Sequence, residues 1–339
     1  MVKLRVMTEP FNEPSSKPIS AFKALLEGFE RLAAAPLLIL PSLILDLLFW
    51  MGPQLKISSL VQLLASGISI PPDATVELVE QVQLIRTELI DIGTRFNLAT
   101  ALSSFPVGIP SLMSGRMPVE NPLGLRIFFD LDGSAMIVGA WIVLMVLGLG
   151  LGVRYQLWIA RQAAPESDLG NGWKTWLRML GFVAAAFVFV TLYVFISLMV
   201  ITLGTGVHPL LGMLVLFLSV SLIFWLVIYL IFTPHGIVRY KLGMIRAMVE
   251  SAAVVRLSLM GTMGFLALAF IINWITLQVW ILPPEESWFA LLSILGHAFV
   301  SSMLWVASYI YYQGRRDYIL SRLGELRFGG FISGPPRAS

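Results

Sequence analysis

The stretch Ile231-Phe-Thr-Pro-His-Gly-Ile-Val-Arg-Tyr-Lys241 ends one long apolar run, and Ser258-Leu-Met-Gly-Thr-Met-Gly-Phe-Leu266 begins the next. Between the runs lies a connector with four cationic residues and one acid: Arg239, Lys241, Arg246, Arg256 and Glu250. Cationic side chains that flank membrane-length apolar runs favour the cytoplasmic side of a membrane. We therefore expect this connector to face the cytoplasm, and the remaining segments to follow from it by alternation.

The composition indicates a membrane protein. The 339 residues are 57% hydrophobic and 13% charged, with a mean hydropathy of +0.83, whereas a soluble domain carries about 25% charged residues. The net charge of +3 is spread over connectors without a nucleic-acid-binding motif, so membrane orientation explains it better than a nucleic-acid partner. The absence of cysteine excludes disulfides, iron–sulfur clusters and thiolate metal sites.

The spacing of apolar runs predicts an all-α, polytopic membrane protein with six transmembrane helices. A run of roughly 18 or more apolar residues is needed to cross a hydrocarbon core about 30 Å thick. The first predicted span is shorter than this and is interrupted by Asp46. The predicted spans are Ala35–Met51, Ala135–Tyr155, Leu177–Leu203, Leu210–Phe232, Leu259–Leu282 and Trp288–Tyr312.

Charge asymmetry predicts the orientation. Eighteen of the 23 lysines and arginines fall in the N-terminal region, the second and third connectors, and the C-terminal tail. The other five lie in the long first loop, which counts weakly because long segments follow the positive-inside rule poorly. The sequence therefore predicts both termini in the cytoplasm and residues 52–134 outside. We expect a multi-pass protein of the bacterial cytoplasmic membrane.

The chain divides into three parts by composition. Residues 1–17 are expected to be a disordered lead-in, residues 18–328 the membrane domain, and residues 329–339 a flexible tail. At the start of the membrane domain, Phe22, Leu25, Phe29 and Leu32 form an apolar helical stripe within Ile19–Ala35. We expect this helix to lie along the cytoplasmic interface.

The predicted extracytoplasmic insertion, residues 52–134, is expected to be helical. Pro71-Pro72-Asp73 is typical of a helix start. Beyond it runs a heptad-like seam of six apolar residues: Leu78, Val82, Ile85, Leu89, Ile92 and Phe96. Three heptads are short for an intermolecular coiled coil, so packing against a helix at Ser58–Leu64 is favoured. Prolines 106, 110, 118 and 122 indicate an irregular segment after the seam.

The third connector contains Pro234, Arg246-Ala247, Glu250-Ser251 and Arg256, and the last predicted span ends in Tyr309–Asp317. In these residues the chain resembles the membrane domain of glycerophosphodiester phosphodiesterases and related bacterial six-helix families. The first span and its loop also resemble uncharacterised membrane proteins of filamentous bacteria, at Leu45–Pro53, Arg95–Leu98 and Pro110–Met113. The resemblance implies no catalytic residues, because the phosphodiesterase activity of that family belongs to a separate soluble domain.

Three polar side chains lie deepest in the predicted spans: Asp46, Asn273 and His297. At about 1.5 Å per residue, all three fall at a similar level in the outer half of the membrane. A carboxylate there is costly unless it is paired or hydrated, so an Asp46–His297 pair in a proton-coupled or substrate path is one interpretation. In the other interpretation, Asp46 reaches water at the end of a short span, and the Asn273 side chain hydrogen-bonds between neighbouring helices.

The remaining motifs predict packing. Gly148-Leu-Gly150-Leu-Gly152 and Gly261-Thr-Met-Gly264 offer small faces for close helix approach. His208 and His235 lack a second ligand at metal spacing and are expected to be interfacial. We find no catalytic, cofactor-binding or metal-binding motif; Asp130-Leu-Asp132-Gly133 lacks the further ligands of a calcium loop.

These observations favour a non-enzymatic membrane protein that serves assembly or the organisation of lipid and envelope. Its expected partners are the bilayer, with anionic lipid at the cytoplasmic face, and a protein at the extracytoplasmic insertion. The alternative is a small transporter or permease with a polar site around Asp46, Asn273 and His297. A lipid-modifying enzyme would need converging acids and bases, which the sequence does not indicate.

Overall fold

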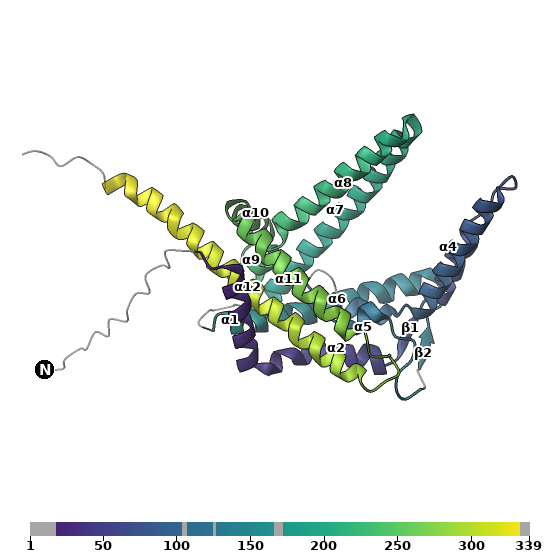
Figure 1. The fold of residues 1–339 in the computed structure, drawn as a ribbon, viewed down its shortest axis with the longest axis horizontal. Coiled ribbons are helices and arrows are strands. Elements are labelled where there is room, and N and C mark those ends of the chain that lie inside the picture. The colour runs from purple at the N-terminus through teal and green to yellow at the C-terminus, as the bar shows by residue number, and fades with distance from the viewer. Residues whose placement is uncertain (1–17, 104–106, 125–126, 166–171, 333–339) are drawn as a thin grey trace, which may run out of the picture.

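A computed structural model describes residues 18–103, 107–124, 127–165 and 172–332, with side chains as far as residue 320 (Figure 1). The predicted lead-in and the last seven residues lie outside this part. Five long helices dominate: α6 (Ser134–Ala163), α7 (Gly172–Val207), α8 (Pro209–Leu230), α11 (Leu259–Trp280) and α12 (Ala290–Ile332). The predicted all-α class is confirmed. Helix α12 is longer than the predicted span and runs into the predicted tail.

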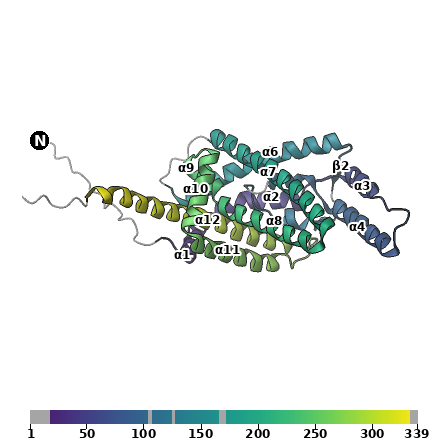
Figure 2. The same cartoon turned by 90° about the horizontal axis from the view of Figure 1, so that it is seen from above.

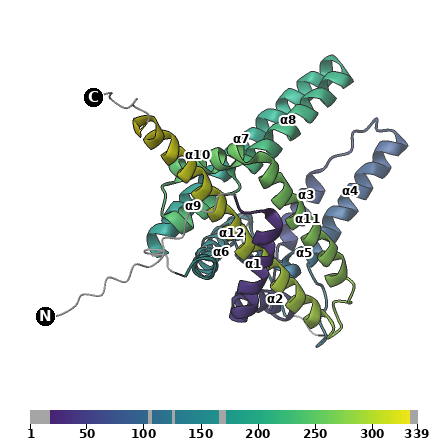
Figure 3. The same cartoon turned by 60° about the vertical axis from the view of Figure 1, so that its left-hand side comes forward.

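Among the residues that the structure describes, five helical segments are long and apolar enough to cross a membrane, and a bent pair raises the number to six. Helices α7 and α8 are the most lipid-like, because none of the most apolar window of α7 is buried and only 6% of that of α8. The two helices pack on each other and project from the rest of the molecule (Figures 1 and 3). Helices that are apolar all round and so exposed need a hydrocarbon environment.

The bent pair consists of α1 (Ala21–Ala34) and the segment Pro36–Met51, which meet at 99°. That segment contains the 3-10 helix η1 (Pro36–Ile39) and α2 (Leu40–Met51). Ser20 caps α1, its hydroxyl accepting a hydrogen bond from the Lys23 amide. The first predicted span is therefore a short helix behind a sharp turn, and α2 alone is 12 residues long.

Together α1 and α2 follow α12 in the opposite chain direction. Ile19 lies against Gly314, and Gly28 lies against Ala307. Further along, the rings of Phe29 and Phe299 are 5.8 Å apart, and those of Trp50 and Trp288 are 6.1 Å apart. Helix α1 thus packs lengthwise on α12, which differs from the isolated interfacial helix expected from its apolar stripe.

The insertion between α2 and α6 is closed by two short strands. Strand β1 (Gln54–Lys56) pairs in parallel with β2 (Phe128–Asp130), Leu55 opposite Phe129. Between them lie α3 (Ser58–Gly67), α4 (Val76–Arg95), η2 (Leu98–Ser103) and α5 (Leu112–Arg116). The α3–α4 hairpin and the C-terminal half of α12 occupy opposite ends of the molecule (Figure 2).

Helix α4 packs on α3 as predicted, but with a shifted face. Val82 is 8% exposed and Gly93 is buried against Val61 of α3. Ile85 and Ile92 of the predicted seam are 54% and 53% exposed. A Cβ atom at Gly93 would lie 2.6 Å from the Val61 side chain, so only a residue without a side chain fits at this inward position.

The basic connector between α8 and α11 folds into two helices, α9 (Thr233–Tyr240) and α10 (Met244–Leu257). Residues Thr233 to Val238 of α9 are buried between neighbouring helices. Lys241 ends α9 in the left-handed region at φ 55°, and its carbonyl accepts a hydrogen bond from Arg178 of α7. This connector is therefore part of the packed bundle.

Candidate functional site

Asp46 is fully buried and its carboxylate holds the start of α5. Its Oδ1 accepts hydrogen bonds from the Ser111 hydroxyl at 2.5 Å and from the Met113 amide at 2.8 Å. One turn earlier on α2, the Ser42 hydroxyl donates to the Pro110 carbonyl at 2.5 Å. Residues four apart share one face of a helix, so this face of α2 binds the segment before α5.

His297 is the second predicted residue that the structure brings to this site. Its Nδ1 lies 3.9 Å from Asp46 Oδ2, and the His297 side chain is 13% exposed. Both atoms are buried, and neither has a hydrogen-bond partner among the residues that the structure describes. The predicted pairing of Asp46 with His297 is therefore seen as close approach, at a distance longer than a hydrogen bond.

Asn273 does not join them. It is half-buried on α11, and its backbone carbonyl accepts a hydrogen bond from the Thr276 hydroxyl. Within the described part of the chain, its carboxamide hydrogen-bonds neither Asp46 nor His297. Of the three residues predicted at a similar depth, the structure brings together only Asp46 of α2 and His297 of α12.

A second set of contacts ties the insertion to the loop between α11 and α12. The indole of Trp50, which is fully buried, donates to the Glu285 carbonyl at 2.8 Å. The Glu285 carboxylate accepts from the Val119 amide at 3.1 Å and lies 4.0 Å from Arg116. Arg116 also donates to the Pro283 carbonyl at 2.9 Å. Periodicity alone could not reveal these residues, because they come from α2, from the end of α5 with the segment after it, and from the loop between α11 and α12.

Two chemical roles are open to this arrangement. The first is mechanical, because a buried carboxylate with two hydrogen bonds on Oδ1 fixes the backbone that supplies them. The second is proton exchange, because Asp46 Oδ2 and the His297 imidazole could share a proton through one intervening water molecule. The first role uses contacts already formed, and the second uses the two atoms that are left without partners.

His235, expected at the interface, is instead buried at 3% exposure. Its Nε2 is 2.8 Å from the Ser308 hydroxyl of α12, and its ring centroid is 4.3 Å from that of Tyr309. The rings of Phe232 and Trp305 also lie close to it, at 5.4 and 5.9 Å. The apolar residues around His235 indicate burial, whereas the basic residues that follow it predict a position at the membrane surface.

The glycine motifs act in part as predicted. A Cβ atom at Gly152 would lie 2.6 Å from the Val107 carbonyl, so this glycine admits the backbone of the insertion. A Cβ atom at Gly261 would lie 2.4 Å from Arg315 of α12. Gly264 has open space around it, so it makes no close helix contact.

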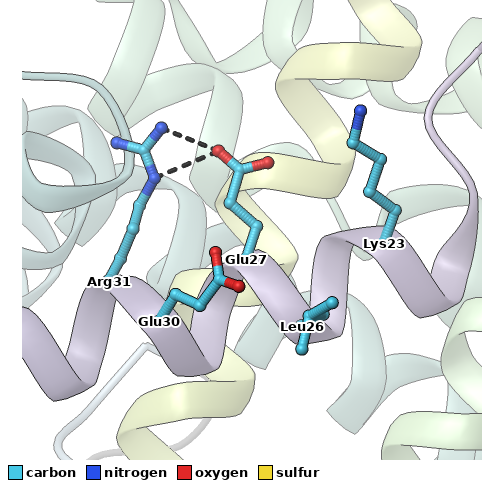
Figure 4. Close-up of a pocket in the computed structure, with 5 residues that line it drawn as sticks. All are labelled: Lys23, Leu26, Glu27, Glu30 and Arg31. Carbon is cyan, nitrogen blue, oxygen red and sulfur yellow. Dashed lines mark hydrogen bonds and ion pairs between the residues drawn. The ribbon is translucent and has the colours of Figure 1, made fainter.

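A hollow of about 430 Å³ lies along α1 (Figure 4). Arg31 donates two hydrogen bonds to Glu27 within it, and a third to the Gln162 carbonyl of α6. The hollow is lined by Lys23, Leu26, Glu27, Glu30 and Arg31. It carries two positive and two negative charges, which suits the polar headgroup region of a membrane better than its hydrocarbon core.

Metal-ligating side chains do not gather anywhere in the ranges that the structure describes: no three histidines or carboxylates converge. The fold is helical, and within the described residues five or six helical segments are long and apolar enough to cross a bilayer, as in a multi-pass membrane protein. No protein-family model, curated protein or solved structure matches the chain.

Proposed function

We propose that this chain is a non-enzymatic assembly protein of the bacterial cytoplasmic membrane, which organises the envelope or its lipids. In this proposal it crosses six times, keeps both termini in the cytoplasm and presents residues 52–134 outside. The observation that carries the proposal is the anchoring of this insertion: Asp46 binds Ser111 and Met113 from within the membrane domain. Because these hydrogen bonds attach the insertion to the membrane domain, they hold the α3–α4 hairpin in one orientation on the outer side of the membrane.

Six crossings are supported by the path of α1 and α2 along α12. Their contacts run from Gly314 of α12 to Trp288, which lies in the loop just before α12. The helical part, from Gly314 to Ala290, is about 36 Å long at 1.5 Å per residue. This exceeds the hydrocarbon thickness of about 30 Å. The bent pair therefore serves as one broken span, with α1 at the cytoplasmic end and α2 at the outer end.

The partner surface in this proposal is the apolar side of the α3–α4 hairpin. Leu63 and Leu84 are 63% and 62% exposed, and Ile85 and Ile92 are more than half exposed. Contiguous exposed apolar side chains outside the membrane mark an interaction site. Anionic lipid is the proposed partner at the other face, where Lys23, Arg246 and Arg256 are exposed.

Site-specific photocrosslinking tests the assembly role. A photoreactive amino acid at Ile85 should yield one discrete crosslinked protein in intact cells, because Ile85 lies on the proposed surface. Gln83, which is exposed and lies two residues before Ile85 on the other side of α4, provides the matched control and should yield none. If Ile85, Leu84 and Ile92 all fail to crosslink while the protein is present at normal levels, the assembly role is wrong.

A proton-coupled transporter is the second candidate, favoured by one observation. Asp46 Oδ2 and His297 Nδ1 are both buried, unpartnered among the described residues and 3.9 Å apart. Titratable groups at this depth mark proton and ion paths in many membrane proteins. Asp46→Asn retains an oxygen for Ser111 and Met113, so it should abolish proton movement while leaving the insertion anchored.

A further inference from the structure

One face of α12 carries polar side chains along the whole depth of the bundle. They are Ser293, His297, Ser301, Ser308, Tyr312 and Arg316. Steps of four and seven residues keep them on one face of a helix. From His297 to Arg316 the face extends about 28 Å at 1.5 Å per residue. This length is close to the thickness of a hydrocarbon core, about 30 Å.

Neighbouring helices place polar groups beside α12 at successive levels. Asp46 of α2 lies 3.9 Å from His297, and the Tyr155 hydroxyl of α6 lies 2.8 Å from Ser302, which follows Ser301 and points about 100° away from this face. Next, His235 of α9 lies 2.8 Å from Ser308. Three elements besides α12 therefore contribute polar groups at separate levels along it, and we call this set the α12 polar seam.

At its last turn the seam reaches an ion pair. The Tyr312 hydroxyl donates to Glu250 of α10 at 3.2 Å, and Arg316 donates to the same carboxylate oxygen. Arg316 also stacks on the ring of Tyr240 at 3.7 Å, with Arg239 on the same ring. Glu250 and Arg316 are 19% and 15% exposed, so this end of the seam reaches the surface.

Many buried polar atoms beside the seam have no partner among the described residues. Besides Asp46 Oδ2 and His297 Nδ1, they are Ser293 Oγ, both amide atoms of Gln156, Thr233 Oγ1, His235 Nδ1 and Tyr309 Oη. Gln156 is fully buried on α6, which contacts both α9 and α12. Each unsatisfied buried group costs about 1–3 kcal/mol. Ordered water is the usual means of satisfying such groups.

We propose that water molecules fill the gaps in the α12 polar seam and that the seam conducts protons between Asp46–His297 and Glu250–Arg316. The substrate is the hydrated proton. Each hydroxyl, imidazole or water accepts a proton on one side and releases another on the other side, so the protein is unchanged after each transfer. This inference rests on the proton-coupled candidate function and extends it through the cytoplasmic half, where Gln156 and His235 lie.

The test is proton flux into vesicles that contain the full-length protein. The vesicles are made of phosphatidylethanolamine and phosphatidylglycerol, carry a pH-sensitive dye, and are energised by a potassium gradient with valinomycin. The wild type should move protons faster than protein-free vesicles. Gln156→Leu and His235→Phe should lower the flux about tenfold or more, because each interrupts the hydrogen-bonded chain. His208→Asn, at an exposed histidine outside the seam, is the matched control and should leave the flux unchanged.

The outcomes separate the proposals. Wild-type flux no greater than that of protein-free vesicles overturns the seam and the proton-coupled candidate together, and leaves the assembly role to the crosslinking test. Flux that falls in Asp46→Asn but not in Gln156→Leu or His235→Phe keeps the proton-coupled candidate and overturns the route through the seam. Tyr155→Phe, which loses one hydroxyl and keeps its ring, replaces any variant that does not fold, and it too should lower the flux.

Discussion

The two oxygens of the Asp46 carboxylate have different surroundings. Its Oδ1 satisfies the Ser111 hydroxyl and the Met113 amide, while its Oδ2 faces His297 without a partner in the described chain. A buried carboxylate whose two oxygens both accept hydrogen bonds serves a structural role. A carboxylate with one unpartnered oxygen can still accept a hydrogen bond from a further donor. The two oxygens of Asp46 therefore correspond to the two candidate functions, and substitutions can separate them.

Asp46→Ala should destabilise the protein, and Asp46→Asn should do so much less. Alanine leaves the Ser111 hydroxyl and the buried Met113 amide without an acceptor, at a cost of about 2 kcal/mol. Asparagine keeps one oxygen in the place of Oδ1. Thermal unfolding in detergent measures the difference. Equal unfolding temperatures for wild type and Asp46→Ala would show that Asp46 does not anchor the insertion.

His235 shows how local sequence misleads at a single residue. The basic residues Arg239 and Lys241 place a membrane boundary nearby, and that boundary predicts an interfacial histidine. Helix α9 instead turns into the bundle, so that Ser308 and Tyr309 of α12 surround the imidazole. A change of chain direction of this kind leaves no periodic signal in the sequence.

At the scale of elements, the bent pair α1–α2 is the feature that most affects the topology. Pro36 begins η1 directly after α1, where its missing amide hydrogen is tolerated. The 99° bend that follows divides what would be one span into two short helices, each too short to cross a membrane alone. Only their joint packing on α12 gives the length of a crossing.

The contact between α1 and α12 depends on Gly28. A Cβ atom there would lie 2.7 Å from the Ala307 Cβ and 2.9 Å from its backbone. Gly28→Leu should therefore push α1 away from α12, at a cost of about 1–3 kcal/mol for overpacking. Ala33→Leu, at an exposed position on the same helix, is the control. Thermal unfolding compares them, and equal loss in both would contradict the packing.

Helix α4 shows the limit of periodicity within an element. The predicted seam includes Val82 together with Ile85 and Ile92, whereas the structure buries Val82 and Gly93 and leaves Ile85 and Ile92 exposed. The buried face is rotated by less than half a turn from the predicted one, so the same spacing fits both. Gly93 faces inward because the Val61 side chain leaves no room for a Cβ atom there, which hydrophobicity does not encode.

At the scale of the whole molecule, the number of crossings decides where the N-terminus lies. Five crossings would place α1 and the C-terminal half of α12 on opposite sides of the membrane, and six would place them on the same side. The lengthwise contact of α1 with α12, from Gly314 to Ala307, favours the same side. The positive charge of both regions agrees with a shared cytoplasmic location.

Single cysteines can measure this topology without background, because the chain has none of its own. Ser66→Cys and Glu286→Cys should react with a membrane-impermeant maleimide in intact cells. Lys23→Cys and Arg246→Cys should react only after permeabilisation. All four positions are exposed in the structure. Labelling of Lys23→Cys in intact cells, with Arg246→Cys protected, would contradict six crossings and favour five.

The sequence by itself determined the helical membrane class and the positions of the long apolar helices, because length and hydropathy are local properties. It also selected Asp46 and His297, since polar groups in apolar runs are conspicuous. Only the tertiary structure decided that these two meet while Asn273 stands apart, that His235 is buried, and that α1 packs along α12. Such contacts join residues far apart in the chain, and they depend on bends and helix rotations that local hydrophobicity does not specify.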